Sequence, residues 1–115
     1  MFEKIKLIKD AMIIKDDVDH SKSTNEEASR ILFNNKGHKI EIIHSFEYNS
    51  DWMINNDLEH AFLIKGTAIL EDENRNVFEM SEGDCLRIEK NVKHKIIKTS
   101  QHAIWLAIHI GDINE

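Results

Sequence analysis

The 115-residue sequence contains one cysteine, four glycines and no proline. Because a disulfide joins two cysteines, Cys85 cannot form one within the chain, and its lone thiol suits a reducing compartment. The opening residues, MFEKIKLIKD, carry a charge every one to three positions and lack the apolar stretch of a secretory signal. We therefore expect a cytoplasmic protein.

The sequence also lacks the features that two classes of partner require. No run of about 18 apolar residues occurs, so we expect no membrane-spanning helix and no membrane partner. The net charge is −6, and lysine and arginine are scattered along the chain rather than gathered in one segment. Since nucleic-acid binding needs a basic surface, we expect no nucleic-acid partner either.

Several catalytic patterns are missing as well. The sequence contains no Ser/His/Asp arrangement, no Cys-x-x-Cys pair and no glycine-rich phosphate loop, so nucleophilic and nucleotide-binding enzymes have no support. No repeat or Gly/Ser linker divides the chain, and its length suits one hydrophobic core. We therefore expect residues 1–115 to form a single domain.

What the sequence does contain is a series of short strand-like segments rich in Ile, Val, Phe and Thr. Groups of Asn, Asp, Ser and Gly separate them about every ten residues, which favours a closed barrel or sandwich over alternating strands and helices. We expect an all-β domain with N-terminal strands and, in one interpretation, a short helix in residues 1–28, and with the barrel in residues 29–110. The predicted strands are Lys4–Ile8, Ala11–Lys15, Ser29–Phe33, Lys39–Phe46, Glu59–Lys65, Thr67–Glu71, Val77–Met80, Cys85–Ile88, His94–Lys98 and Ala103–Ile110.

Two segments allow more than one interpretation. Ser23 and Glu26 form a capping-box pattern that could begin the short helix. The alternative, which we favour, is a hairpin closed by the Asn-Lys-Gly turn before Lys39–Phe46, because that alternating segment needs an antiparallel partner. Trp52–Leu58 shows no clear period, and we expect a loop that leads into a strand.

The last predicted strand, Ala103–Ile110, is apolar on both faces up to His109. A strand that is buried on both faces needs cover on both, and in a small barrel the interior covers only one. The N-terminal strands or a second subunit would cover the other face. We therefore expect a homodimer.

Two spacings within the predicted barrel point to a family. Glu59 is followed seven residues later by Gly66, and Gly83 is followed eleven residues later by His94. With these motifs, the stretch from Trp52 to Ile110 resembles the small single-domain cupins and, more narrowly, a group of short bacterial cupins of unassigned function. The resemblance implies a double-stranded β-helix, or jelly-roll, barrel with the motif side chains pointing into its mouth. Cupins include dioxygenases, isomerases, decarboxylases and sugar-binding proteins, so the fold alone does not give the chemistry.

The chain departs from the family pattern in both motifs. Counted back from Glu59, the two usual histidines would fall at Trp52 and Ile54 or at Met53 and Asn55, and none of these is a histidine. In the second motif, the usual proline and second glycine are replaced by Glu89 and Asn91.

The resemblance implies a set of candidate site residues. Cupins commonly hold Fe, Mn, Ni or Zn with histidines and a glutamate. Here Glu59 and His94 remain, and His109 on the last strand is the third candidate metal ligand; the absence of any metal is the other expectation. Trp52, Asn55 and His109 are the residues predicted to contact a ligand. Trp52 would stack on it or, alternatively, would close the barrel end.

A carboxylate inside an apolar barrel needs a partner, so the pair of Glu59 and His94 has three interpretations. It is half of a metal site, an acid–base pair that acts on a small substrate, or a structural ion pair. His60 adjoins Glu59 and must face the other side of a regular strand. We interpret His44 and Cys85 as buried structural residues.

Together, these observations predict a cupin that binds a small molecule in a degenerate pocket, with Glu59 and His94 as the catalytic candidates. If the protein is an enzyme, the resemblance implies isomerase-like or dioxygenase-like chemistry on a small polar metabolite. The alternative is a metal-free structural or interaction module whose pocket is a relic of an enzyme.

Overall fold

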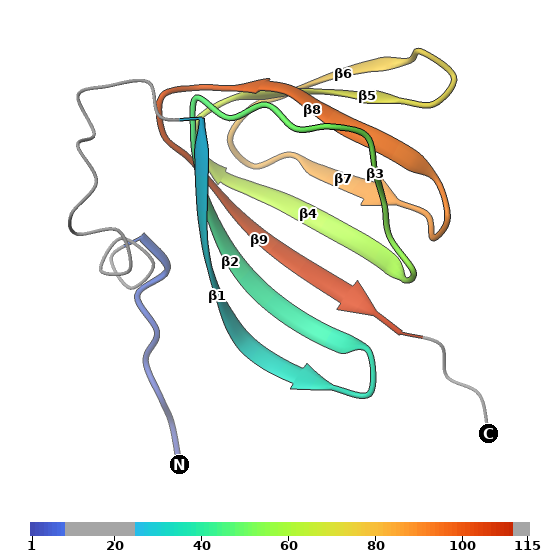
Figure 1. Ribbon diagram of the computed structural model, residues 1–115. Helices are drawn as coiled ribbons and strands as arrows, with labels where there is room; N and C mark the ends of the chain where they lie inside the picture. The colour runs from blue at the N-terminus through green and yellow to red at the C-terminus, as the bar shows by residue number, and fades with distance from the viewer. Residues whose placement is uncertain (9–24, 112–115) are drawn as a thin grey trace.

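Nine antiparallel β-strands make up the secondary structure of the barrel in our computed structural model, which describes residues 1–8 and 25–111 (Figure 1). The prediction of an all-β domain is therefore confirmed. The strands are β1 (Glu26–Asn35), β2 (His38–Phe46), β3 (Met53–Ile54), β4 (Leu58–Lys65), β5 (Ala68–Asp72), β6 (Val77–Met80), β7 (Cys85–Ile88), β8 (Lys93–Thr99) and β9 (Ala103–Ile110). Within the described residues, no helix is long and apolar enough to span a bilayer.

The strands form two sheets, as the predicted jelly roll requires. One has the strand order β1-β2-β9-β4-β7 and the other the order β3-β8-β5-β6. In Figure 1 the strands β5, β6 and β8 lie above the broad sheet that contains β2, β9 and β4. The last strand, β9, lies in the middle of the larger sheet, between β2 and β4.

The hairpin of β1 and β2 is confirmed over the helical alternative, since β1 already begins at Glu26. Lys36 and Gly37 form its turn with φ values of 52° and 84°, as a tight hairpin turn requires.

The predicted strand Lys4–Ile8 is wrong, because the described residues 1–8 contain no strand. The predicted strand Ala11–Lys15 lies outside the described residues. The segment Trp52–Leu58, expected to be a loop, contains the short strand β3.

Alternation along the strands separates the inner face of the barrel from its outer face. The inner core includes Leu63, Leu70, Ile96 and Trp105, all nearly inaccessible to solvent. Leu70, Ile96 and Trp105 also line a cavity in the interior. Cys85 is exposed because Leu86 and Ile88 turn inward on β7, so the prediction of a buried thiol is wrong.

The outer face of the larger sheet carries a second apolar cluster. Ile42 and Ile104 have no solvent-accessible surface, and Leu7, Leu32 and Leu106 pack against them. The N-terminal segment therefore covers part of this face, as expected, through Leu7 rather than through a strand.

His44 lies fully buried beside this cluster, as its interpretation as a structural residue requires. Its Nε2 is 3.3 Å from the carbonyl oxygen of Leu7, so this nitrogen carries a hydrogen and donates it. In the neutral ring, Nδ1 then accepts a hydrogen bond from Nε2 of His102, 2.8 Å away. The ring of His102 stacks on Phe46, with centroids 5.0 Å apart.

The two motif glycines, Gly66 and Gly83, have the positive φ that tight turns of a barrel require. Gly66 has φ of +88°, and a Cβ there would lie 2.6 Å from the carbonyl oxygen of His102 and from Oγ of Ser100. Gly83 has φ of +93° in open space. Asn91, which replaces the second glycine of the motif, also has a positive φ, of 65°. Asparagine tolerates this conformation better than most residues, so the backbone of the motif is retained.

Candidate functional site

A cavity of about 250 Å³ opens between the two sheets at the polar end of the barrel. Its apolar wall includes Ile43, Met53, Leu70 and Trp105. The polar side chains that line it are Glu27, Lys39, Glu41, Asn55, Glu59, His94 and His109.

Strand pairing places three of these residues in one row. On the central strand β9, His109 lies opposite Lys39 of β2 and opposite Glu59 of β4. All three side chains line the cavity, because directly paired residues point to the same face of a sheet. His60 does not line the cavity, as its position next to Glu59 predicts.

The carboxylate of Glu59 has two neighbours. Nδ2 of Asn55 donates a hydrogen bond to Oε1 at 2.6 Å. Oε2 lies 4.0 Å from Nε2 of His109, which is an ion-pair distance rather than a hydrogen bond. The side chain of Glu59 keeps only 13% of its surface exposed, and the amide of Asn55 replaces part of its hydration.

His109 is held from its other side by a residue that the sequence did not indicate. Nδ1 of His109 lies 2.9 Å from Oδ1 of Asp57. Since a carboxylate only accepts hydrogen bonds, Nδ1 carries the hydrogen and Nε2 is left to face Glu59. Asp57 directly precedes β4, so the alternation of side chains along a strand could not predict whether the Asp57 side chain points into the barrel.

His94 reaches the cavity from the opposite sheet. It is 6% exposed, and its Nδ1 lies 3.1 Å from the carbonyl oxygen of Val92, to which it donates. Glu59 pairs with Asn55 and His109, and the described residues include no hydrogen bond or ion pair between Glu59 and His94. His94 also lines a second cavity of about 220 Å³, which shares Leu70 and Ile88 with the first.

Three further charged residues line the cavity and were not singled out from the sequence. Lys39 and Glu41 form an ion pair of 3.6 Å on β2. The carboxylate of Glu27 accepts a hydrogen bond of 3.1 Å from Oγ of the fully buried Ser45. Part of Glu27 is solvent-accessible, yet desolvation of its carboxylate raises the pKa of this group. The hydrogen bond from Ser45 lowers that pKa, whereas the charges of Glu41 and Glu59 raise it further.

Comparison with known proteins rests on structure, since no family model and no curated protein matches the sequence. A crystal structure from Ralstonia eutropha JMP134, proposed to be a mannose-6-phosphate isomerase, has a TM-score of 0.79 and 24% identity over 96% of this chain and 99% of its own. A cupin superfamily protein from Desulfitobacterium hafniense DCB-2 has a TM-score of 0.70 and 15% identity over 76% and 80% of the two chains. The chain has the cupin fold. The DMSP lyase DddQ from Ruegeria pomeroyi DSS-3 matches with a TM-score of 0.68 and 14% identity over 77% of this chain, which spans 49% of the lyase.

The cupin barrel shows which pair of residues stands where the two motif histidines are usual. Met53 and Asn55 line the cavity, whereas Trp52 and Ile54 are 42% and 51% exposed. A thioether and an amide therefore occupy this wall of the cupin cavity, and the amide is already bonded to Glu59.

The candidate metal ligands Glu59, His94 and His109 line one cavity, but they do not fit a metal centre as they lie. Across residues 1–8 and 25–111, no group of three or more His, Cys, Asp or Glu side chains is placed to hold a metal ion. Asp57 and Asn55 instead engage His109 and Glu59. We therefore assign no step of a reaction to a metal.

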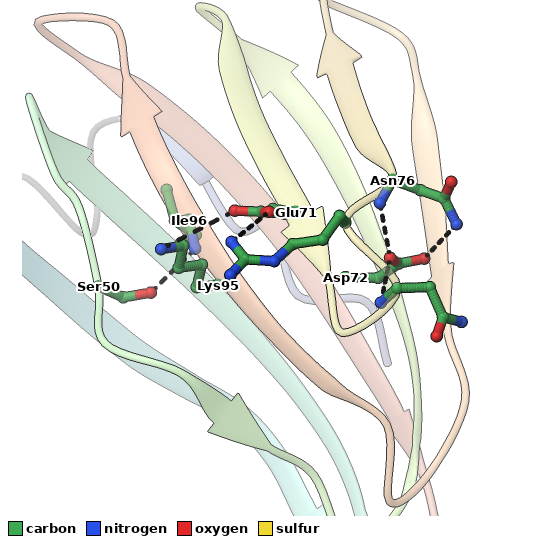
Figure 2. A network of polar contacts seen from close by, with 8 residues as sticks. Ser50, Glu71, Asp72, Asn76, Lys95 and Ile96 are labelled. Carbon is green, nitrogen blue, oxygen red and sulfur yellow. Dashed lines mark hydrogen bonds and ion pairs between the residues drawn. The ribbon is translucent and has the colours of Figure 1, made fainter.

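Trp52 lies outside the cavity that contains the other candidates. Nζ of Lys95 lies over its ring, 4.8 Å from the centroid. Lys95 also pairs with Glu71 at 3.8 Å, and Figure 2 shows these two residues beside the hydrogen bond from the backbone N–H of Ile96 to Ser50. The ligand contact predicted for Trp52 stays a prediction, and it would concern this outer surface.

Proposed function

We propose that this cupin binds a small polar metabolite in the cavity between its sheets and transfers protons on it. The observation that carries the proposal is the arrangement of Asp57, His109 and Glu59. Two carboxylates flank one imidazole, and Glu59 and His109 both line a cavity large enough for a small molecule.

The role of each residue follows from its contacts. Asp57 fixes the orientation and tautomer of His109, so that Nε2 can accept a proton or, once protonated, donate one. Glu59 is the second acid–base group, and Asn55 holds one of its oxygens in place. His94 faces them from the other sheet and would contact the ligand through Nε2. An isomerisation, which moves protons within one substrate, needs an acid and a base arranged in this way.

The electrostatics of the cavity support a functional site over a structural ion pair. Desolvation raises the pKa of the Glu27 carboxyl, and the charges of Glu41 and Glu59 raise it further, so these carboxylates repel one another. Repulsion within one cavity lowers the stability of the fold, and such costs are typical of sites that act on ligands.

The substitution Glu59→Gln tests this proposal. It keeps an oxygen for Asn55 and removes a charge, so we expect the melting temperature to stay the same or to rise. Ligand binding should fall at least tenfold, measured by NMR on the ring signals of His94 and His109 during screening of a library of small polar metabolites. Glu79→Gln on β6, an exposed position, is the matched control. A clear loss of stability in Glu59→Gln, with no compound shifting the ring signals, would favour the structural module instead.

Elemental analysis of protein purified without chelator tests the metal-linked form of this proposal. Stoichiometric Fe, Mn, Ni or Zn would require Glu59, His94 and His109 to rearrange around the ion. Sub-stoichiometric content after growth with each metal in turn would rule that form out.

We propose further that the protein acts as a cytoplasmic homodimer. On the outer face of the larger sheet, Phe33 pairs with Ile40 and remains 48% exposed, and Ile110 at the end of β9 is 38% exposed. A second copy would bury these apolar side chains. Light scattering after size-exclusion chromatography checks this, because a particle of 13.4 kDa at micromolar concentration would be a monomer.

A further inference from the structure

The charged side chains that line the cavity are mostly carboxylates, and the indole N–H of Trp105 on its apolar wall is the one buried side-chain polar atom without a partner among the described residues. Three carboxylates, those of Glu27, Glu41 and Glu59, line it together with one ammonium group, that of Lys39. With both imidazoles neutral, the formal charge of this lining is −2. Lys39 lies 3.6 Å from Glu41, so its charge is largely committed to that partner.

His94 adds an independent indication of what the cavity accepts. It is 6% exposed, and its Nδ1–H is committed to the carbonyl oxygen of Val92. Its Nε2 has no hydrogen-bond partner among the described residues, and His94 lines the cavity. In the neutral ring this nitrogen is an acceptor, so an acceptor is offered to whatever enters the cavity.

The carboxylates of Glu27, Glu41 and Glu59 line one cavity and repel added negative charge. In agreement with this, desolvation raises the pKa of the Glu27 carboxyl although the residue is exposed, the hydrogen bond from Ser45 lowers it, and the charges of Glu41 and Glu59 raise it further. A phosphate or carboxylate ligand would meet the same repulsion. An ammonium group would relieve it, and hydroxyl groups would donate to the free acceptors.

We propose that the cavity selects a small amine that also carries hydroxyl groups, and that it rejects phosphates and carboxylates. This inference rests on the proposed function, since it names the class of ligand for the same cavity. The ammonium group would lie among Glu27, Glu41 and Glu59, and a hydroxyl group would donate to Nε2 of His94.

A matched set of probes tests the charge preference on the full chain. D-glucosamine, D-glucose and D-glucose 6-phosphate share one ring and differ in charge, and each is titrated while the ring signals of His94 and His109 are followed by NMR. A fragment set with equal numbers of ammonium, uncharged and anionic compounds accompanies them. We expect D-glucosamine to bind at least tenfold more tightly than D-glucose 6-phosphate, and ammonium fragments to predominate among the binders.

Variants then locate the source of the preference. Glu41→Gln should reduce the ratio between D-glucosamine and D-glucose 6-phosphate severalfold, whereas Glu79→Gln on the exposed strand β6 should leave it unchanged. Equal or tighter binding of the anionic compounds would overturn the charge preference while the proposed binding function stands. If no compound of any charge shifts the ring signals, the binding function fails and this inference fails with it.

Discussion

Oδ1 of Asp57 lies 2.9 Å from Nδ1 of His109, although 52 residues separate the two in the sequence. This contact ties the start of β4 to the end of β9 and fixes which nitrogen of the imidazole faces Glu59. The side chains are 24% and 11% exposed, so water competes only partly for the bond.

Replacing Asp57 by alanine should therefore release the imidazole of His109. We expect a loss of about 1.5 to 3 kcal/mol in the free energy of unfolding, as for other hydrogen bonds to charged groups, measured by urea denaturation. The ¹⁵N shifts of the His109 ring should change from one fixed tautomer to a mixture. Asp51→Ala, at an exposed position, is the control. Unchanged ring shifts in Asp57→Ala would show that this contact does not orient His109.

Glu27→Gln should stabilise the protein at neutral pH. The pKa of Glu27 is raised above its ordinary value of 4.5, so ionisation costs more in the folded state than in the unfolded state. That cost is absent below about pH 4.5 and grows as the pH rises through the folded pKa. The melting temperature of the variant should therefore exceed that of the wild type at pH 7, and the difference should vanish near pH 4. A difference that is constant from pH 4 to 8 would contradict this origin.

His44 should make the fold sensitive to mild acid. Burial lowers its pKa below the ordinary 6.5, and Lys65 acts in the same direction against the hydrogen bond to Leu7. Stability contributed by the neutral ring is present above pH 6.5 and is lost as the pH falls toward the folded pKa. His44→Gln keeps a donor for Leu7 and an acceptor for His102, so its melting temperature should fall less between pH 7 and pH 5.

The control for this prediction is His38→Gln at the start of β2, which should keep the acid sensitivity of the wild type. Hydrogen exchange in the described N-terminal residues gives a second measurement. Protection there should decrease with acid in the wild type and much less in His44→Gln, and equal behaviour of the two proteins would assign the sensitivity to other groups.

The two motif glycines should differ in their tolerance of alanine. At Gly66 a Cβ would meet the carbonyl oxygen of His102 at 2.6 Å, in addition to the strain of a positive φ. At Gly83 nothing lies within 4 Å, so only the strain applies. We expect Gly83→Ala to cost about 1 kcal/mol and Gly66→Ala more than about 2 kcal/mol in urea denaturation. Equal costs would show that the neighbours of Gly66 move aside freely.

Local sequence patterns were sufficient for most of the fold. Strand-like segments between turn residues predicted the barrel strands from Lys39 onward except the short β3, and the need of Lys39–Phe46 for a partner predicted the hairpin. The strand Lys4–Ile8 was predicted wrongly because alternation over a few residues does not establish that a pairing partner exists. Cys85 was predicted wrongly because its face depends on which side of β7 meets the core.

The site was predictable only in part, for a related reason. The motif spacings led to Glu59 and His94, and the position of His109 on the last strand led to the third residue that lines the cavity. Lys39 and Glu41 share one face of β2, but that this face points inward depends on pairing with β9, about 70 residues away. Asp57 lies before its strand begins, where no periodicity applies. The charge of the cavity, which is decisive for its ligand, is set by these long-range pairings.

The central place of β9 has a consequence for how the chain assembles. During synthesis β9 emerges after the other eight described strands, yet it separates β2 from β4 in the finished sheet. Until it inserts, those two strands present unpaired backbone edges, which are templates for aggregation. Because pairings between distant segments slow folding, the insertion of β9 should be a slow step. The row of Lys39, His109 and Glu59 is completed only by the final insertion step, so a nascent chain has no site until its sheet closes.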